Sequence, residues 1–158
     1  MKLYVLSDTH GKINKALEVY DKLHSVDLII HLGDMEQDAR KISEGTGKKV
    51  ISVKGNNEFS YSLESFHILE TEYGNLFLTH GHLQGVKGGL QKLLYRTQEL
   101  GCKAALFGHT HIPLFIQEDG IYLLNPGSLT FPLPGGSPAS YAIVNTSEND
   151  FSASIVYY

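Results

Sequence analysis

Five short apolar runs in this sequence each end directly before residues that can bind a metal ion. The runs span residues 3–6, 28–32, 50–53, 76–78 and 104–107. The segments after them are Ser7-Asp8-Thr9-His10, Gly33-Asp34, Gly55-Asn56, Thr79-His80-Gly81-His82 and Gly108-His109-Thr110-His111. Short apolar runs punctuated by glycine are typical of buried strands. In an α/β sheet, strands of this kind bring the residues after them to one edge, so we expect these side chains to converge.

Helical spacing of apolar residues predicts three helices, at residues 13–23, 38–44 and 90–100. We expect Gly45 and Gly47 to end the second helix and Gly101 to end the third. After residue 111, apolar runs at 114–117 and 121–124, and at 141–144 and 151–157, predict two hairpins. This order favours one α/β domain over residues 1–158, with two packed sheets or one large mixed sheet.

The composition argues against several classes of protein. The 158 residues are 42% hydrophobic and 19% charged, which is ordinary for a globular protein. Because no apolar run approaches the ~20 residues that cross a bilayer, we expect no membrane partner. A net charge of -4 without a dense Lys/Arg block argues against extended nucleic-acid binding. The single Cys102, and an apolar start that runs straight into Asp8 without a cleavage pattern, predict a cytoplasmic protein.

The candidate ligands offer oxygen and imidazole nitrogen and no sulfur. They are Asp8, His10, Asp34, Asn56, His80, His109 and His111. This donor set suits Mn, Fe, Ni or Zn and disfavours a structural Cys-rich zinc site. In the Asp-x-His and His-x-His pairs, residues two apart in an extended chain point to the same side. Any one of these residues alone would read as an ordinary polar residue at a strand end, but five such ends together predict a metal centre.

Glycine precedes three of the candidate ligands. Gly33, Gly55 and Gly108 stand directly before Asp34, Asn56 and His109. A glycine removes side-chain bulk where the backbone turns tightly, so we interpret these positions as part of the site.

Taken in order, these motifs resemble those of the calcineurin-like metallophosphoesterases. The resemblance covers residues 1–111, and the later Asn125-Pro126-Gly127-Ser128 extends it to the small prokaryotic phosphodiesterase branch. It implies a four-layer αββα sandwich, with two mixed β-sheets flanked by helices and a dinuclear metal site at one end. The implied cofactors are two divalent ions, with Mn first and Ni, Fe or Zn as alternatives.

The same resemblance distributes the ligands between the two ions. It implies that Asp34 bridges them, with Asp8, His10 and His111 on one ion and Asn56, His80 and His109 on the other. A hydroxide that bridges two metals attacks phosphorus directly in such sites. The implied activity is therefore that of a phosphodiesterase or phosphatase acting on a small phosphorylated substrate.

Three features leave roles open. Many members of the family have a His that protonates the leaving group at the position of Asn57, and an amide supplies no proton at neutral pH. His82 either faces the pocket as a catalytic residue, beside Asp34 and Asn56, or lies outside the ligand set. The Asn125–Ser128 turn either contacts substrate or stabilises the His109–His111 loop. His31, inside an apolar run, is expected to be a hydrogen-bonded structural residue.

A rival interpretation is a non-catalytic scaffold. The superfamily that the chain resembles includes a retromer subunit that binds partner proteins and has some of its metal ligands replaced. All seven ligand positions are intact here, which favours an enzyme. We expect the loops at residues 59–65 and 82–89 to govern substrate choice, and aromatic residues near the C-terminus are compatible with a homo-oligomer.

Overall fold

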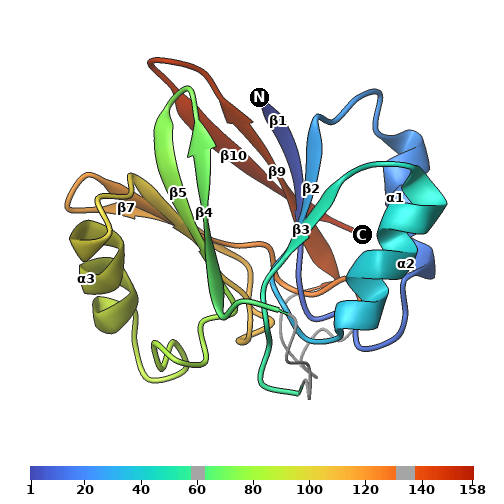
Figure 1. The fold of residues 1–158 in the computed structure, drawn as a ribbon, viewed down its shortest axis with the longest axis horizontal. Coiled ribbons are helices and arrows are strands. Elements are labelled where there is room, and N and C mark those ends of the chain that lie inside the picture. Colours follow the sequence, from blue (N-terminus) through green and yellow to red (C-terminus); the bar gives the residue numbers. More distant parts are fainter. Residues whose placement is uncertain (58–62, 131–137) are drawn as a thin grey trace.

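The computed structural model describes residues 1–57, 63–130 and 138–158, which form ten strands and three helices (Figure 1). Residues 59–62 of the loop expected to govern substrate choice lie outside this description. The elements are β1 (Lys2–Leu6), α1 (Asn14–Lys22), β2 (Leu28–His31), α2 (Glu36–Thr46), β3 (Val50–Ser52), β4 (Phe66–Thr71), β5 (Gly74–Thr79), α3 (Gln91–Glu99), β6 (Ala104–Leu106), β7 (Leu114–Glu118), β8 (Ile121–Asn125), β9 (Ser140–Thr146) and β10 (Phe151–Tyr157).

The strands form two mixed sheets of five strands each. The first has the order β10-β9-β1-β2-β3, in which β1, β2 and β3 are parallel and β9 and β10 are antiparallel to their neighbours. The second has the order β4-β5-β6-β8-β7, in which the three central strands are parallel and the two edge strands antiparallel. Of the two architectures that the sequence left open, the protein therefore adopts two sheets.

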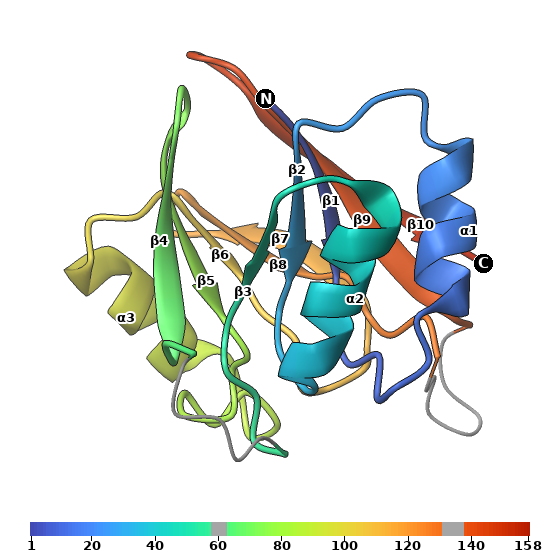
Figure 2. The same cartoon turned by 45° about the vertical axis from the view of Figure 1, so that its right-hand side comes forward.

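Side-chain alternation along the strands builds four layers. In β1, Val5 packs into the core between the sheets, whereas its neighbour Tyr4 packs on the outer face with residues of α1 and α2. In β5, Leu78 faces the same central core and Phe77 packs outward against α3. Figure 2 shows α1 and α2 on one side of the paired sheets and α3 on the other. The resulting αββα sandwich confirms the predicted fold class.

Parallel strands bring their carboxyl ends to one end of the molecule. In the first sheet, the register pairs Leu6 with His31 and His31 with Ser52, so the loops after β1, β2 and β3 start side by side. In the second sheet, Leu78 and Leu124 both pair with Leu106, which aligns the loops after β5, β6 and β8 in the same way. Loops from both sheets therefore carry the predicted ligands.

Two elements differ from the sequence predictions. Helix α2 is longer than residues 38–44, and Gly45 lies inside it rather than ending it. A side chain at Gly45 would come within 2.9 Å of Leu17, so the glycine lets α2 pack closely against α1, while Gly47 (φ 66°) terminates the helix. Strand β4 was not predicted, because it is a half-exposed edge strand without a buried apolar run. Both predicted hairpins, β7–β8 and β9–β10, are confirmed.

The helices also bear on membrane association. Within the described ranges, none of the three helices is both long enough and apolar enough to span a bilayer.

Candidate metal centre

The backbone at five candidate ligands is left-handed. Asp8, His10, Asp34, His109 and His111 have φ angles between 47° and 68°. Non-glycine residues adopt this region infrequently, and such residues cluster at functional sites. The expectation that the Asp-x-His and His-x-His pairs converge because the chain is extended is therefore wrong. They come together because left-handed residues turn the chain sharply after each strand.

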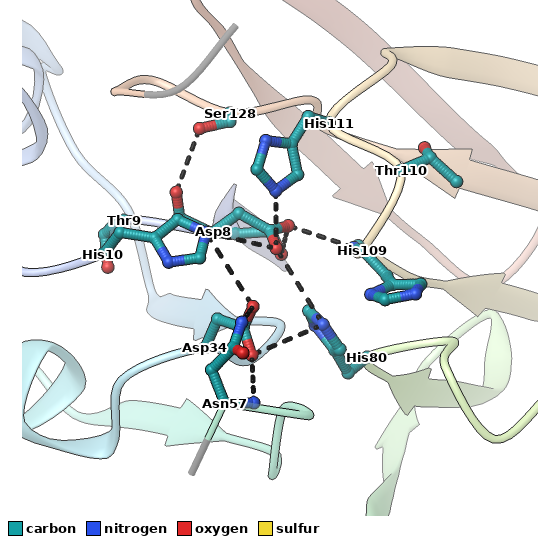
Figure 3. Close-up of polar contacts among 12 residues, drawn as sticks. Asp8, Thr9, His10, Asp34, Asn57, His80, His109, Thr110, His111 and Ser128 are labelled. Carbon is teal, nitrogen blue, oxygen red and sulfur yellow. Dashed lines mark hydrogen bonds and ion pairs between the residues drawn. The ribbon is translucent and has the colours of Figure 1, made fainter. Parts of the chain in front are cut away.

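The carboxylate of Asp8 lies at the centre of three imidazoles (Figure 3). Its Oδ1 is 3.2 Å from His111 Nε2, 3.9 Å from His80 Nε2 and 4.0 Å from His10 Nε2. This oxygen is buried, and of the three imidazoles that of His111 is the nearest to it. Burial by itself would raise the pKa of Asp8, but the hydrogen bond to His111 and the charge of His80 outweigh it and lower that pKa. The group is therefore an anion at neutral pH.

Asp34 occupies a position between two parts of the cluster. Its Oδ2 lies 3.8 Å from His10 Nε2, and its Oδ1 lies 3.6 Å from His80 Nε2. The backbone amide of Asn57 donates to Asp34 Oδ1 at 3.1 Å, and the Asn57 side-chain amide donates to Oδ2 at 2.8 Å. These two bonds hold the carboxylate in one orientation. Asn57, which the sequence presented only as a missing proton donor, therefore orients Asp34.

The hydrogen bonding of His80 determines which of its ring nitrogens faces the cluster. Nδ1 lies 2.7 Å from the carbonyl oxygen of Leu32 and donates its proton there, because a carbonyl only accepts. In the neutral ring Nε2 is then an acceptor, and it faces Asn56 Oδ1 at 3.0 Å as well as both carboxylates. These oxygens and an unprotonated Nε2 would repel one another, so a positive charge has to lie among them, either a proton on Nε2 or a metal ion in its place. The arrangement fits a bound divalent metal ion.

His109 joins the cluster through both its backbone and its ring. Its backbone amide donates to Asp8 Oδ2 at 3.0 Å, and its ring centroid lies 5.0 Å from that of His80. Burial, together with the charges of His80 and Lys87, lowers the pKa of His109 to about 4. A neutral imidazole is the form that binds metals, so this ring is ready to act as a ligand at neutral pH.

The structure thus brings together all seven residues that the sequence singled out. Two overlapping groups, Asp8–His10–His111 and Asp8–Asp34–His80, place one ligand atom from each member within 4.8 Å of one another. Asn56 contacts the second group through His80, and His109 packs beside it. All the donors are oxygen or imidazole nitrogen, which is the set that suits Mn, Fe, Ni and Zn.

The glycines before the ligands are required by close contacts. A side chain at Gly55 would collide with the carboxylate and the backbone of Asp34. One at Gly33 would come within 2.7 Å of the His80 ring, and Gly33 also has a φ of 100°. The interpretation of these glycines as part of the site is therefore supported by contacts with the ligands themselves.

His82 lies beside the ligand cluster. Its ring centroid is 5.4 Å from that of His80 and 6.1 Å from that of His109. Its Nδ1 is buried without a hydrogen-bond partner in the described ranges. Burial, reinforced by the charge of His80, lowers the pKa of His82, so the ring is neutral at neutral pH. His82 thus lies beside the ligands, a position compatible both with contact to a bound phosphate and with a supporting role behind the ligands.

Asp38 supports the site and was not predicted. It is buried at the start of α2 and accepts from the hydroxyl of Thr9 at 2.6 Å and from the amide of Gly11 at 2.7 Å. Thr9 and Gly11 are the residues directly before and after His10, so Asp38 fixes the backbone on both sides of this ligand. His31 Nε2 lies 2.9 Å from the same hydroxyl, which confirms the expected structural role of His31. Acidic residues in the first turn of a helix, here Glu36 and Asp38, usually only complement the helix dipole, so the sequence carried no signal for this role.

The Asn125–Ser128 turn supports the ligand loops. Asn125 is fully buried, and its side-chain amide donates to the carbonyl oxygen of Gly108 at 2.9 Å and to the hydroxyl of Thr110 at 3.0 Å. Ser128 donates to the carbonyl oxygen of Asp8 at 2.9 Å. Between stabilising the His109–His111 loop and contacting substrate, these bonds favour the stabilising role.

Comparison with known proteins identifies the family. The model of the calcineurin-like phosphoesterase superfamily domain matches residues 1–149. The probable metallophosphoesterase YsnB of Bacillus subtilis is 36% identical over 160 residues, covering 100% of this chain and 90% of that protein. The phosphodiesterase YfcE of Escherichia coli K12 is 33% identical over 171 residues, covering 92% of this chain and 88% of that protein.

Solved structures agree with this assignment. A predicted phosphoesterase from Streptococcus pneumoniae superposes with a TM-score of 0.83 at 31% identity, covering 99% of this chain and 88% of that one. The Zn²⁺ complex of Vps29 from Entamoeba histolytica, at 20% identity, shares the fold with a TM-score of 0.81 over 99% and 98% of the two chains. The chain belongs to the calcineurin-like phosphoesterase superfamily, and by class it is a metal-dependent phosphoester hydrolase.

The contact between Gly55 and Asp34 leads to a first prediction. Gly55→Ala should displace Asp34, lower the free energy of unfolding by about 1–3 kcal/mol and weaken Mn²⁺ binding, because the added methyl group has no space. Gly88→Ala is the matched control, since its nearest contact would be 3.5 Å from the carbonyl oxygen of Gly85. Urea unfolding and titration calorimetry measure both effects. Equal behaviour of the two variants would contradict the contact.

A second prediction concerns stability against pH in the metal-free protein. Burial lowers the pKa of His31 from 6.5 to about 4, so the unfolded chain binds a proton that the folded chain excludes between these values. Stability should be fully present above about pH 6.5 and fall as the pH is lowered toward 4. His31→Gln should reduce this slope by up to about 1.4 kcal/mol per pH unit. His24→Gln, at an exposed position, should not, and equal slopes for the two variants would count against the assignment.

Proposed function

We propose that this chain is a one-domain phosphodiesterase that hydrolyses a P–O bond of a small phosphorylated substrate at a dinuclear metal site. The observation that carries the proposal is the position of Asp34. Its two carboxylate oxygens face different imidazoles, with Oδ2 toward His10 and Oδ1 toward His80. A carboxylate shared in this way is suited to bridge two cations.

The distances support a division of the ligands between two ions. One ion would be held by Asp8, His10 and His111, whose donor atoms form one compact group. The other would be held by His80, Asn56 and His109, since His80 contacts Asn56 and packs against the His109 ring. Mn is proposed first, with Ni, Fe and Zn as alternatives, because imidazole–carboxylate sites accept several of these ions.

When bound, two divalent cations in such a site lower the pKa of water and offset the negative charge of the phosphoryl oxygens. The protein's own residues prepare the site for them. Asn57 fixes the orientation of Asp34 through two hydrogen bonds, and His80 presents Nε2 because Leu32 accepts its Nδ1 proton. We assign to the neutral His82 ring, which lies beside His80, the role of donating a hydrogen bond to a phosphoryl oxygen; its proximity to His80 supports this.

The alternative is a protein-binding scaffold without catalysis, as in the retromer subunit. The similarity to Vps29 concerns the fold alone, at 20% identity. The convergence of seven intact donors favours the enzyme, because a scaffold has no need for acceptors that face one another. Assembly into a homo-oligomer stays a prediction; Tyr157 and Tyr158, which are 57% and 46% exposed, are the candidate contacts.

Metal stoichiometry gives the third prediction. Wild-type protein should bind two Mn²⁺ per chain and hydrolyse bis(4-nitrophenyl) phosphate, and a chelator should abolish this activity. Asp34→Asn should weaken binding of both ions together, whereas His10→Ala should mainly remove one, because in the proposed division Asp34 contacts both ions and His10 only one. Elemental analysis after gel filtration measures the occupancy. Retention of two ions by Asp34→Asn would refute the bridge, and a wild type without hydrolysis at full metal loading would favour the scaffold.

The fourth prediction concerns the leaving group. With Asn57 engaged to Asp34 and His82 neutral, neither supplies a proton readily, so rates should depend steeply on leaving-group pKa. General acid catalysis is worth about 10²–10⁴-fold, and that factor should be missing for alkoxide leaving groups. His82→Gln should slow aryl and alkyl diesters by the same factor, because it removes a phosphoryl contact. A loss confined to poor leaving groups would instead identify His82 as the acid.

A further inference from the structure

An apolar cavity of about 370 Å³ lies against the loop that carries His109 and His111. Its walls include Phe107, Leu114 and Leu90, and Leu90 is the residue directly before α3. Phe107 is fully buried, so its ring is a fixed part of the wall. Cavities of this volume are at the small end of those that bind organic ligands, and they are usually apolar with a few polar groups at one side.

The cavity is continuous with the ligand loop. Thr110, which lines it, lies between His109 and His111 in the chain and is held by the side chain of Asn125. In Figure 3 the Thr110 side chain points away from the Asp8 carboxylate, so one short loop faces the metal ligands on one side and the cavity on the other.

One cationic side chain acts on both regions. Lys87 lines the cavity, and its charge also acts on the ring of His109. Lys87 is exposed, as is Ile112, whose side chain is 52% exposed at the same cavity. A ligand that reaches from the metal centre into the cavity would therefore meet a positive charge first and apolar surface beyond it.

We propose that this cavity binds the aromatic or heterocyclic ester group of a phosphodiester whose phosphate is held at the metal centre. This inference rests on the proposed function and names its substrate class. Lys87 complements a phosphoryl oxygen, while the partly exposed Leu90, Leu114 and Ile112 remove one ring from water. The volume suits a single ring system such as a phenyl group or a nucleobase, and it is too small for a polymer.

Binding of two phosphonates tests this without turnover. Phenylphosphonate and methylphosphonate share the anionic head group and differ in the group that would enter the cavity. Titration calorimetry on the Mn²⁺-loaded protein should show that phenylphosphonate binds about tenfold more tightly or better, as expected for partial burial of a ring. Methyl resonances of Thr110 and Ile112 should shift with phenylphosphonate only.

Three variants separate the contributions. Ile112→Ala should weaken the binding of phenylphosphonate by about fourfold, which corresponds to the burial of one methylene group, and leave the affinity for methylphosphonate unchanged. Ile116→Ala is the matched control, since Ile116 is 37% exposed on β7 and does not line the cavity, and it should change neither affinity. Lys87→Gln should weaken both phosphonates by a similar factor, because it acts on the shared head group.

The outcomes distinguish this inference from the proposed function. Equal wild-type affinities for the two phosphonates, failure of both to bind, or an equal effect of Ile112→Ala and Ile116→Ala would overturn the cavity assignment. If the protein hydrolyses bis(4-nitrophenyl) phosphate but binds the two phosphonates equally well, the proposed function stands and only the role of the cavity is refuted. Preference for phenylphosphonate without any hydrolysis would support the cavity and refute the phosphodiesterase.

Discussion

The rest of the structure depends on a group of hydrogen-bond acceptors held against one another. Asp8 Oδ1, Asp34 Oδ1 and Asn56 Oδ1 all face His80 Nε2, whose partner nitrogen has already donated its proton to Leu32. Burying two carboxylates beside one imidazole is costly unless a positive charge, a proton on Nε2 or a metal ion, compensates them. The free energy for this arrangement has to come from the fold and from a bound cation. Binding of a metal ion at this site should therefore stabilise the folded protein.

The two-sheet architecture makes the arrangement possible. Parallel strands in each sheet end at the same side of the molecule, so loops from both sheets meet there. Left-handed residues turn the chain sharply after β1, β2 and β6. Gly55 lets the loop after β3 come into contact with Asp34. Around this cluster, Asp38 and Asn125 hold the loops in place from buried positions. Local strain is thus balanced by hydrogen bonds from the surrounding core.

Much of this could be predicted from the sequence, because buried strands and metal ligands both have strong local patterns. The runs that became β1, β2, β5 and β6, and the donors after them, were visible in the order of residues. The left-handed backbone at Asp8 and His10 was not, since it depends on contacts with Asp38 and Ser128 that are distant in sequence. The contact of Asn57 with Asp34 could not be predicted either, because a sequence shows which residue occupies a position but not which carboxylate it binds.

The central claim is that Asp34 joins two metal ions into one centre, and electron paramagnetic resonance of the Mn²⁺-loaded protein tests it most directly. Two Mn²⁺ ions that share a carboxylate interact magnetically, so the fully loaded wild type should give an exchange-coupled spectrum. Asp34→Ala, loaded as far as it accepts metal, should lose that coupling because the shared carboxylate is gone. A fully loaded wild type that shows only the hyperfine pattern of isolated Mn²⁺ would contradict the dinuclear account.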